Sequence, residues 1–497
     1  MHMGVRRCGF TALVLMGLGL ATMACDDGKS QTADDDNDGD MEEKDDDVDI
    51  GLPEGPAPTI SDLEVTENPN NILSCYVSWQ TDVSAISTVE FGEGAYRFRI
   101  RSDEVTTDHR VLVIGMHAES DYHIKAVSET TGGKGEAETT YTTGTLPEVV
   151  SVPSLGVTDV EGMQEGWTLL NLSDMSQAPP PPMVAAMYDM DGLPVWYFIN
   201  EDAPDSHGDT PVDLIDGNII TVGAVAYEIP PKEIDLSGKV LWEGQPQVMR
   251  EAITHHFEKL EDGTYVALRE VYSDLLRGDI VEVFTADFGV MWKWNTFDYV
   301  DWVDDVTSGD WSHCNSVTVA PEEDAFYLSC RNFSNVLKVS LSGHMDIIWR
   351  LGEGGSFDSD PDASVPWFAE QHDPEIQPNG NILIYDNGTL ERNASRVVEY
   401  ALDTDRMRTE IVWEFPGDFD VDPWYKESWF TNYWGDADRQ PNGNTLVVAG
   451  NIPGRGEASR VFEVTEDGRV VWEVSFPNNG IYRAQRLSPP PLVEKIP

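Results

Sequence analysis

Residues 311–400 contain the side chains most suited to chemistry. His313 and Asn315 occur in the phrase WSHCNSV, Arg331 occurs in SCRNF, and His372 occurs in EQHDPEI. An imidazole can act as a nucleophile or as a general acid or base near neutral pH, and a guanidinium binds tetrahedral oxyanions through parallel hydrogen bonds. We therefore predict that these four residues form the core of an active site for an anionic group.

Further histidines fall at equivalent positions along the chain. His255 and His372 each stand seven residues before the Asp or Asn of a tight-turn phrase, LEDG in one case and QPNG in the other. His313 opens the corresponding strand between them, and His256, next to His255, is a second choice. A single histidine at a strand start is usually structural, but three in phase beside an arginine indicate a site. The arginine argues against zinc, because a fixed cation repels a metal ion. We expect no metal and no cofactor there.

A repeat from about residue 150 predicts the elements that position these residues. Phrases such as LSGKVLWEG and EDGRVVWEV place a tryptophan after a short apolar run, and a phrase with a tight turn precedes most of them. The tryptophans are Trp196, Trp242, Trp292, Trp349, Trp413 and Trp472. Each unit reads as a four-stranded blade, so residues 150–497 are predicted to form a six-bladed β-propeller, with a closing strand at 481–487. Its innermost strands line a central channel toward which the polar residues point.

Residues 57–147 alternate apolar and polar side chains in about seven short runs, which predicts a small Ig-like β-sandwich and an all-β chain. Trp79 fits a buried core tryptophan, and Tyr122 fits a tyrosine corner. The pattern resembles fibronectin type III domains. The histidines of this part, His109, His117 and His123, are expected at the surface.

The N-terminal residues predict export and anchoring. Residues 1–24 have the composition of an export signal, and their apolar run is too short for a good transmembrane helix. Small residues stand directly before Cys25, as at bacterial lipoprotein processing sites, so we expect lipidation of Cys25. Residues 25–56 are acidic with few large apolar side chains, which predicts a solvated tether. An exported protein of the cell envelope or periplasm, attached to a membrane only through its lipid, is therefore expected.

The formal net charge of −57 excludes some partners. A surface this acidic repels nucleic acid and a bare anionic membrane. Residues 26–49 hold 13 Asp or Glu residues, but the remainder of the chain is also strongly acidic. An anionic substrate must therefore be attracted by a few well-placed cations. The sequence does not indicate an oligomeric state.

Several of these phrases together resemble a known family. WSHCNSV, SCRNFSNVLKV, IIWRLGEGG, EQHDPEIQPNGNILIYDNG and GDADRQPNGNTL look like the bacterial arylsulfotransferases that work without a nucleotide sulfate donor. The resemblance covers about 150–497. It implies a six-bladed propeller and an aryl-sulfate sulfotransferase that moves a sulfuryl group from a phenolic sulfate ester to a phenolic acceptor. It also implies a ping-pong mechanism through a sulfohistidine, with small molecules as partners.

The resemblance assigns roles to individual residues. The nucleophile falls on His372, the H-x-N pair on His313 and Asn315, the downstream arginine on Arg331, and the earlier histidine on His255 or else His256. Nucleophilic attack by imidazole splits one difficult transfer into two easier steps. Arg331 and Asn315 stabilise charge on the sulfuryl oxygens, and His313 or His255 exchanges a proton with the phenol.

Other residues and functions complete the prediction. Trp367 and Tyr482 could hold a phenol ring, with core packing as the alternative role. Some family members carry a disulfide before the nucleophile, but 332–371 contains no cysteine. Cys314 and Cys330 flank a predicted hairpin and nearly face each other, so an oxidising compartment permits a disulfide there. Two alternative functions stay open: an aryl sulfate hydrolase, and a non-catalytic propeller that binds an extracellular ligand.

Overall fold

The computed structural model describes residues 51–173, 182–201, 211–215, 219–222, 230–245, 253–303, 309–416, 429–452 and 458–496. The predicted export signal, Cys25 and most of the acidic segment lie outside these residues. Residues 51–497 form one compact unit. Within the described part, strands dominate and the α-helix is limited to the short α1 (Thr296–Tyr299), so the prediction of an all-β chain is confirmed.

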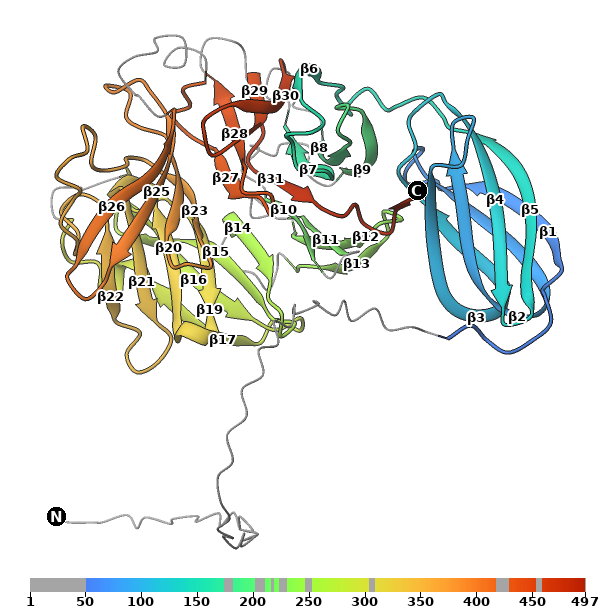
Figure 1. The fold of residues 1–497 in the computed structure, drawn as a ribbon. Coiled ribbons are helices and arrows are strands. Elements are labelled where there is room, and N and C mark those ends of the chain that lie inside the picture. The colour runs from blue at the N-terminus through green and yellow to red at the C-terminus, as the bar shows by residue number, and fades with distance from the viewer. Residues whose placement is uncertain are drawn as a thin grey trace, which may run out of the picture. The chain divides into compact units, whose positions relative to one another are not determined.

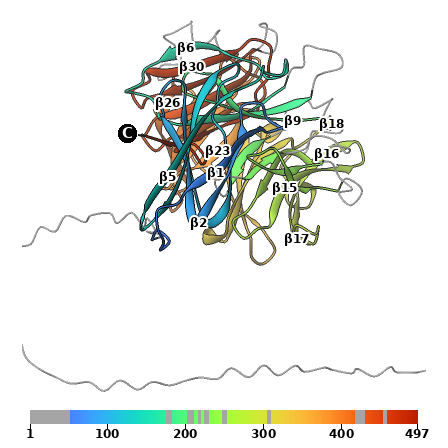
Figure 2. The same ribbon diagram turned by 90° about the vertical axis from the view of Figure 1, so that its right-hand side faces the viewer.

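The N-terminal part consists of five strands: β1 (Ile60–Glu67), β2 (Cys75–Gly92), β3 (Phe98–Val113), β4 (Asp121–Thr130) and β5 (Gly133–Thr142). They form one antiparallel sheet, which the short β32 (Glu494–Lys495) joins through β3. Figure 2 turns this part toward the viewer. We expected about seven strands, but β2 runs through two of the predicted apolar runs, with its pairing to β3 shifting register between Gln80 and Ala85. The fibronectin type III sandwich stays a prediction.

Two expected features of this part are present, and one expectation is wrong. Trp79 is 2% exposed and donates its indole N–H to Ser128 Oγ at 2.8 Å. The backbone N–H of His117 donates to the hydroxyl of Tyr122 at 2.8 Å, the contact typical of a tyrosine corner. His109, however, is buried and stacks on Trp79, because the hydroxyl groups of Thr81 and Ser87 form hydrogen bonds with its two ring nitrogens.

The rest of the described chain forms six antiparallel sheets. The first orders β31 (Ala484–Leu487), β7 (Trp167–Leu172), β8 (Met183–Tyr188) and β9 (Pro194–Asn200). The second orders β10 (Val212–Ile215), β11 (Ile219–Val222), β12 (Lys232–Asp235) and β13 (Val240–Glu243). The third orders β14 (Ile253–Lys259), β15 (Tyr265–Ser273), β16 (Leu276–Phe284) and β17 (Val290–Asn295), with β18 (Gly309–Asp310) beside β16.

The last three sheets follow the same pattern. The fourth orders β19 (Cys314–Ala320), β20 (Ala325–Cys330), β21 (Asn335–Ser340) and β22 (Ile347–Leu351). The fifth orders β23 (His372–Ile376), β24 (Ile382–Asp386), β25 (Arg396–Asp403) and β26 (Arg408–Phe415). The sixth orders β27 (Asp436–Arg439), β28 (Thr445–Ile452), β29 (Ala458–Val464), β30 (Val470–Phe476) and β6 (Ser154–Thr158). Figure 1 shows them in chain order, from green at β7 to red at β30.

The six tryptophans of the repeat lie on the last strands of their sheets, β9, β13, β17, β22, β26 and β30. Indole N–H groups on four of these strands donate to a carbonyl in the outer hairpin of the next sheet, and a fifth, on the sixth sheet, donates back to the first. The pairs are Trp196 with Leu236, Trp242 with Ala286, Trp294 with Met345, Trp413 with Glu466, and Trp472 with Met190. Each such bond contributes roughly 0.5–1.5 kcal/mol and ties neighbouring sheets together.

Distant parts of the sequence complete the first and sixth sheets. The predicted closing segment 481–487 contains β31, which pairs with β7 in antiparallel register from Ala484↔Leu170 to Leu487↔Trp167. At the other edge, β6 pairs with β30. A strand from near the C-terminus thus completes the first of these six sheets, as the red β31 beside the green β7 shows (Figure 1).

A buried ion pair reinforces this junction. Arg486 on β31 and Glu463 on β29 lie 3.3 Å apart, with both side chains 0% exposed. The guanidinium also lies over the ring of Trp472. The other carboxylate oxygen of Glu463 accepts hydrogen bonds from Asn444 and from the backbone N–H of Gln164. The first and sixth sheets therefore share one fully buried polar network.

We expect Arg486→Met to lower the free energy of unfolding by about 3–5 kcal/mol, because it leaves the Glu463 carboxylate buried without its cation. The double variant Arg486→Met/Glu463→Gln should recover much of that loss, because glutamine is neutral and keeps an oxygen that accepts from Asn444. Guanidinium denaturation of both variants measures the two values. A single variant as stable as the wild type would show that the ion pair does not hold the sheets together.

Candidate active site

The site is assembled at the starts of the innermost strands. His255 and His256 belong to β14, His313 directly precedes β19, His372 opens β23, and Arg483 directly precedes β31. The ring centroids of His255 and His313 lie 4.7 Å apart. The structure therefore brings together histidines from consecutive sheets, as their equivalent positions in the sequence predict.

The backbone is strained where these strands begin. The φ angles of His255, His313, Asp373 and Trp434 are 57°, 46°, 39° and 63°, in the left-handed region that side-chain-bearing residues rarely adopt. Each such residue costs about 1–3 kcal/mol and is typical of functional sites. The distortion lets two neighbouring residues turn inward. His256 is therefore as buried as His255, although a regular strand would place them on opposite faces.

Hydrogen bonds determine which nitrogen of His372 carries the proton. Its Nδ1 lies 2.8 Å from Oδ1 of Asn387. The amide group of Asn387 donates to the carbonyls of Thr431 and Trp434 at 3.0 and 2.8 Å, so its oxygen must face the histidine. His372 therefore donates from Nδ1, and Nε2 keeps its lone pair. The backbone N–H of Trp434 approaches that lone pair at a long 3.3 Å.

Burial keeps the ring of His372 neutral. Its side chain is 2% exposed, and burial, helped by the positive charge of Arg331, lowers the pKa of His372 to about 3. Burial also lowers the pKa of His255 well below its ordinary value, with His313 adding to the effect. Both imidazoles are therefore uncharged at neutral pH, and the lone pair of Nε2 of His372, which accepts from the backbone N–H of Trp434, is the candidate nucleophile.

His313 has a different environment from the other two histidines. Its Nδ1 contacts the carboxylate of Asp310, and its side chain is 22% exposed. Burial alone would raise the pKa of Asp310, but hydrogen bonds from His313 and Arg277 lower it. Asp310 is therefore a carboxylate that orients His313 through Nδ1, an arrangement suited to proton exchange through Nε2.

Arg331 lies between β20 and β21 with its guanidinium 19% exposed. It forms an ion pair with Glu370 and donates to the carbonyl of Asn432 at 2.9 Å. Its backbone N–H donates to the carbonyl of His313, which ties the two residues together. Arg331 is thus positioned beside the histidines but already has a carboxylate partner, for which an incoming anion must compete.

Asn315 is fully buried and connects two inner strands. Its amide nitrogen donates to the carbonyl of Gln371 at 2.7 Å, next to His372, while its side-chain oxygen has no hydrogen-bond partner. Its own carbonyl accepts from the hydroxyl of Tyr482 at 3.1 Å and from Arg483 at 2.9 Å. In this structure Asn315 positions the strand of His372, and a contact with a sulfuryl oxygen stays a prediction.

Tyr482 and Trp367, the two aromatic residues predicted to hold a phenol ring, lie in different surroundings. The ring of Tyr482 lies 6.3 Å from the ring centroids of both His255 and His372. Trp367 instead stacks on Tyr400 at 6.2 Å and packs against the apolar cluster around it. Tyr482 therefore belongs to the histidine cluster, whereas the contacts of Trp367 are those of core packing.

Sequence reasoning missed two residues of the site. Arg483 pairs with Asp373 at 3.0 Å, reaches His256 at 3.4 Å, and has a side chain only 11% exposed. The sequence did contain an indication of Arg483. This residue stands at the start of the predicted closing strand IYRAQRL, at the position where other inner strands carry histidines. Asn387 in the phrase YDNG reads as an ordinary turn residue, and nothing in that phrase marks its contact with His372.

Cys314 and Cys330 form a disulfide that connects β19 and β20. They are the residues next to His313 and Arg331. The bond therefore holds together the two strand ends that carry the acid–base candidate and the anion-binding candidate.

Comparison with known proteins identifies one family. Residues 159–483 match the model of a family described as Arylsulfotransferase (ASST). No curated protein matches the chain. Among solved structures, the periplasmic gluconolactonase PpgL of Pseudomonas aeruginosa has a TM-score of 0.35 at 11% identity, covering 75% of this chain and 98% of its own. A quinonprotein alcohol dehydrogenase-like protein of Bacteroides thetaiotaomicron has a TM-score of 0.32 at 11% identity, with 83% and 94% covered. Similarities this weak carry no argument about this chain.

Proposed function

The chain belongs to the arylsulfotransferase family, and from that premise we propose that it transfers a sulfuryl group between phenols by a ping-pong mechanism through a sulfohistidine on His372. It is an enzyme of the nucleotide-independent aryl sulfotransferase type, whose substrates are small aryl sulfates and phenols. The observation that carries the mechanistic proposal is the neutral, buried His372 with its Nε2 lone pair facing away from Asn387.

In the first half-reaction, Nε2 of His372 attacks the sulfur of the donor. An N–S bond forms while the bond between sulfur and the aryl oxygen breaks, and the phenolate leaves with the electron pair. In this proposal His313, oriented by its contact with Asp310, donates a proton to that oxygen. His255 is less suited to this task, because burial keeps it neutral.

In the second half-reaction, the acceptor phenol loses its proton to His313, and its oxygen attacks the sulfur. The N–S bond breaks and His372 regains its lone pair. Negative charge on the sulfuryl oxygens is stabilised in both steps by the guanidinium of Arg331, which exchanges its contact with Glu370 for the substrate. The proposal places the transferred group between His372 and Arg331.

The six sheets, in this proposal, are the blades of one propeller with the histidines at the inner strand starts. The support is the set of indole hydrogen bonds that connect the first four sheets in order, the fifth to the sixth, and the sixth back to the first. An experimental structure with a different number of sheets around the histidines would refute it.

For location, we propose an exported lipoprotein of the cell envelope, anchored through Cys25. Within the described residues, no helix is long and apolar enough to cross a membrane. The proposal rests on the sequence of 1–25 alone. We expect Cys25→Ala to move the protein from the membrane fraction to the soluble fraction. Equal amounts of the variant and the wild type in the membrane pellet would contradict lipid anchoring.

The transfer itself is tested with an aryl sulfate such as 4-nitrophenyl sulfate and a phenol acceptor. We expect sulfated acceptor from the wild type and none from His372→Ala, because that variant lacks the nucleophile. His344→Ala, in an exposed turn, serves as the control that keeps activity. Equal release of inorganic sulfate with and without phenol would instead indicate a hydrolase, and binding without any turnover would indicate the non-catalytic alternative.

We expect Asn387→Leu to lower kcat by roughly 10²-fold or more with a smaller change in KM, because the variant leaves the tautomer of His372 undetermined. Asn387→Asp should retain part of kcat, because it keeps an acceptor for Nδ1–H, and should shift the pH profile upward, since a carboxylate favours the imidazolium. Steady-state kinetics across pH measures both. A loss confined to KM in the leucine variant would argue against an orienting role.

A further inference from the structure

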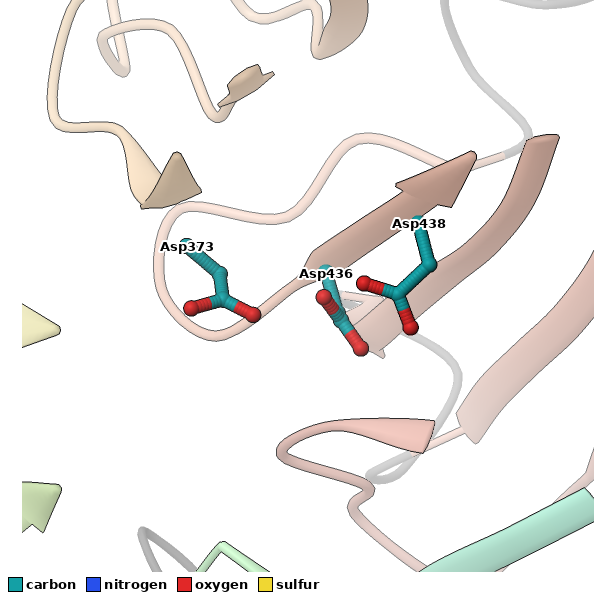
Figure 3. Close-up of side chains that lie close together, drawn as sticks. All are labelled: Asp373, Asp436 and Asp438. Atoms are coloured by element: carbon teal, nitrogen blue, oxygen red, sulfur yellow. The ribbon is translucent and has the colours of Figure 1, made fainter. Parts of the chain in front are cut away.

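Three aspartates converge beside the histidines. Asp373 follows His372 on β23, and Asp436 and Asp438 lie two residues apart on β27, so they share one face of that strand. One carboxylate oxygen from each lies within 4.8 Å of the others. Figure 3 shows the carboxyl groups of Asp373 and Asp438 on either side of Asp436, turned toward it. The sequence analysis did not predict this cluster.

A second observation distinguishes this cluster from a solvated acidic patch. Asp436 is 2% exposed, and its Oδ1 has no hydrogen-bond partner, while its Oδ2 accepts from the backbone N–H of Ala484 at 2.9 Å. A buried carboxylate oxygen without a partner is costly, because it has lost its water. That oxygen belongs to the residue at the centre of the cluster, between the carboxyl groups of Asp373 and Asp438.

The charges in the cluster are unbalanced. Arg483 pairs with Asp373 at 3.0 Å and is the guanidinium that offsets one of the three carboxylates. Among the described residues, neither Asp436 nor Asp438 forms an ion pair, so a divalent ion would meet two carboxyl groups that no cation already holds.

We propose that Asp373, Asp436 and Asp438 bind one Ca²⁺ ion. Oxygen-only ligands select hard cations over zinc and other softer metals. Calcium accepts flexible arrangements of carboxylate oxygens, whereas magnesium demands near-ideal octahedral geometry and keeps most of its waters. Three carboxyl groups whose oxygens lie within 4.8 Å of one another therefore suit calcium better. Asp373 and Asp438 are partly exposed, which gives the ion a route into the site.

The bound ion would stabilise the backbone at the start of β23, next to the proposed nucleophile His372. Asp373 has a left-handed φ of 39° and directly follows His372, and its partner Arg483 donates to the carbonyl of Asn315. A cation that holds Asp373 against β27 therefore stabilises the start of β23. This inference concerns binding and does not depend on sulfuryl transfer, so each can fail without the other.

Isothermal titration of the full-length protein, stripped with EDTA, against CaCl₂ tests the site. We expect one saturable high-affinity event that Asp438→Asn weakens by at least about tenfold, because it removes a charged ligand. Glu410→Gln, an exposed position on β26, is the matched control and should bind as the wild type does. A further control, Asp34→Asn/Asp36→Asn/Asp38→Asn, removes acids of the N-terminal tract and should also leave the event unchanged.

Several results of this titration would contradict the calcium site. No saturable binding would mean that the carboxyl groups hold protons instead of a metal, and would overturn the proposal. So would binding that survives both Asp438→Asn and Asp436→Asn, or that is lost in the N-terminal triple variant. Equal affinity for MgCl₂ would contradict the assignment to calcium. Circular dichroism of each variant without metal establishes that a lost event is not lost folding.

Discussion

The hydrogen bond between Nδ1 of His372 and Oδ1 of Asn387 is the contact on which the proposed chemistry depends. The carbonyls of Thr431 and Trp434 hold the amide of Asn387 in one orientation, so the amide can only accept from the ring. The ring consequently presents the lone pair of Nε2. Burial then keeps this nitrogen unprotonated, although the site must also attract an anion. His372 opens β23, Asn387 follows β24, and Thr431 and Trp434 precede β27, so the fifth and sixth sheets together build this arrangement.

Paired charges dominate the surroundings of the nucleophile. Arg331 contacts Glu370, Arg483 contacts Asp373, and His313 contacts Asp310. Each cation therefore has a carboxylate that fixes its position before substrate arrives. In a chain with a net charge of −57, such local pairs, and not the overall field, decide where an anion can bind. The cluster of Asp373, Asp436 and Asp438 lies next to these pairs and contains more carboxyl groups than Arg483 pairs with. This is the reason for proposing a cation there.

The sequence predicted the succession of sheets well, because each sheet carries a repeat tryptophan on its fourth strand and four of these six donate an indole N–H to a neighbouring sheet. It also predicted that His255, His313 and His372 meet, since equivalent positions in a repeat occupy equivalent places. It did not reveal Asn387 or the roles of Arg483 and Asp436, because their partners are more than ten residues away and no local pattern encodes them. His256 was ranked second on the alternation of a regular strand, which the left-handed φ of His255 breaks. The burial of His109 was also not predictable from local sequence, because it depends on hydroxyl groups of a neighbouring strand more than 20 residues away.

The account's central claim is the covalent intermediate on His372. The most direct measurement is mass spectrometry of the intact protein and its peptides after brief exposure to an aryl sulfate without acceptor, quenched at alkaline pH. The account predicts the added mass of one sulfuryl group on the peptide that contains His372, and its disappearance when phenol is added before the quench. An adduct on another residue, or rapid transfer to phenol with no adduct at any time, would contradict it.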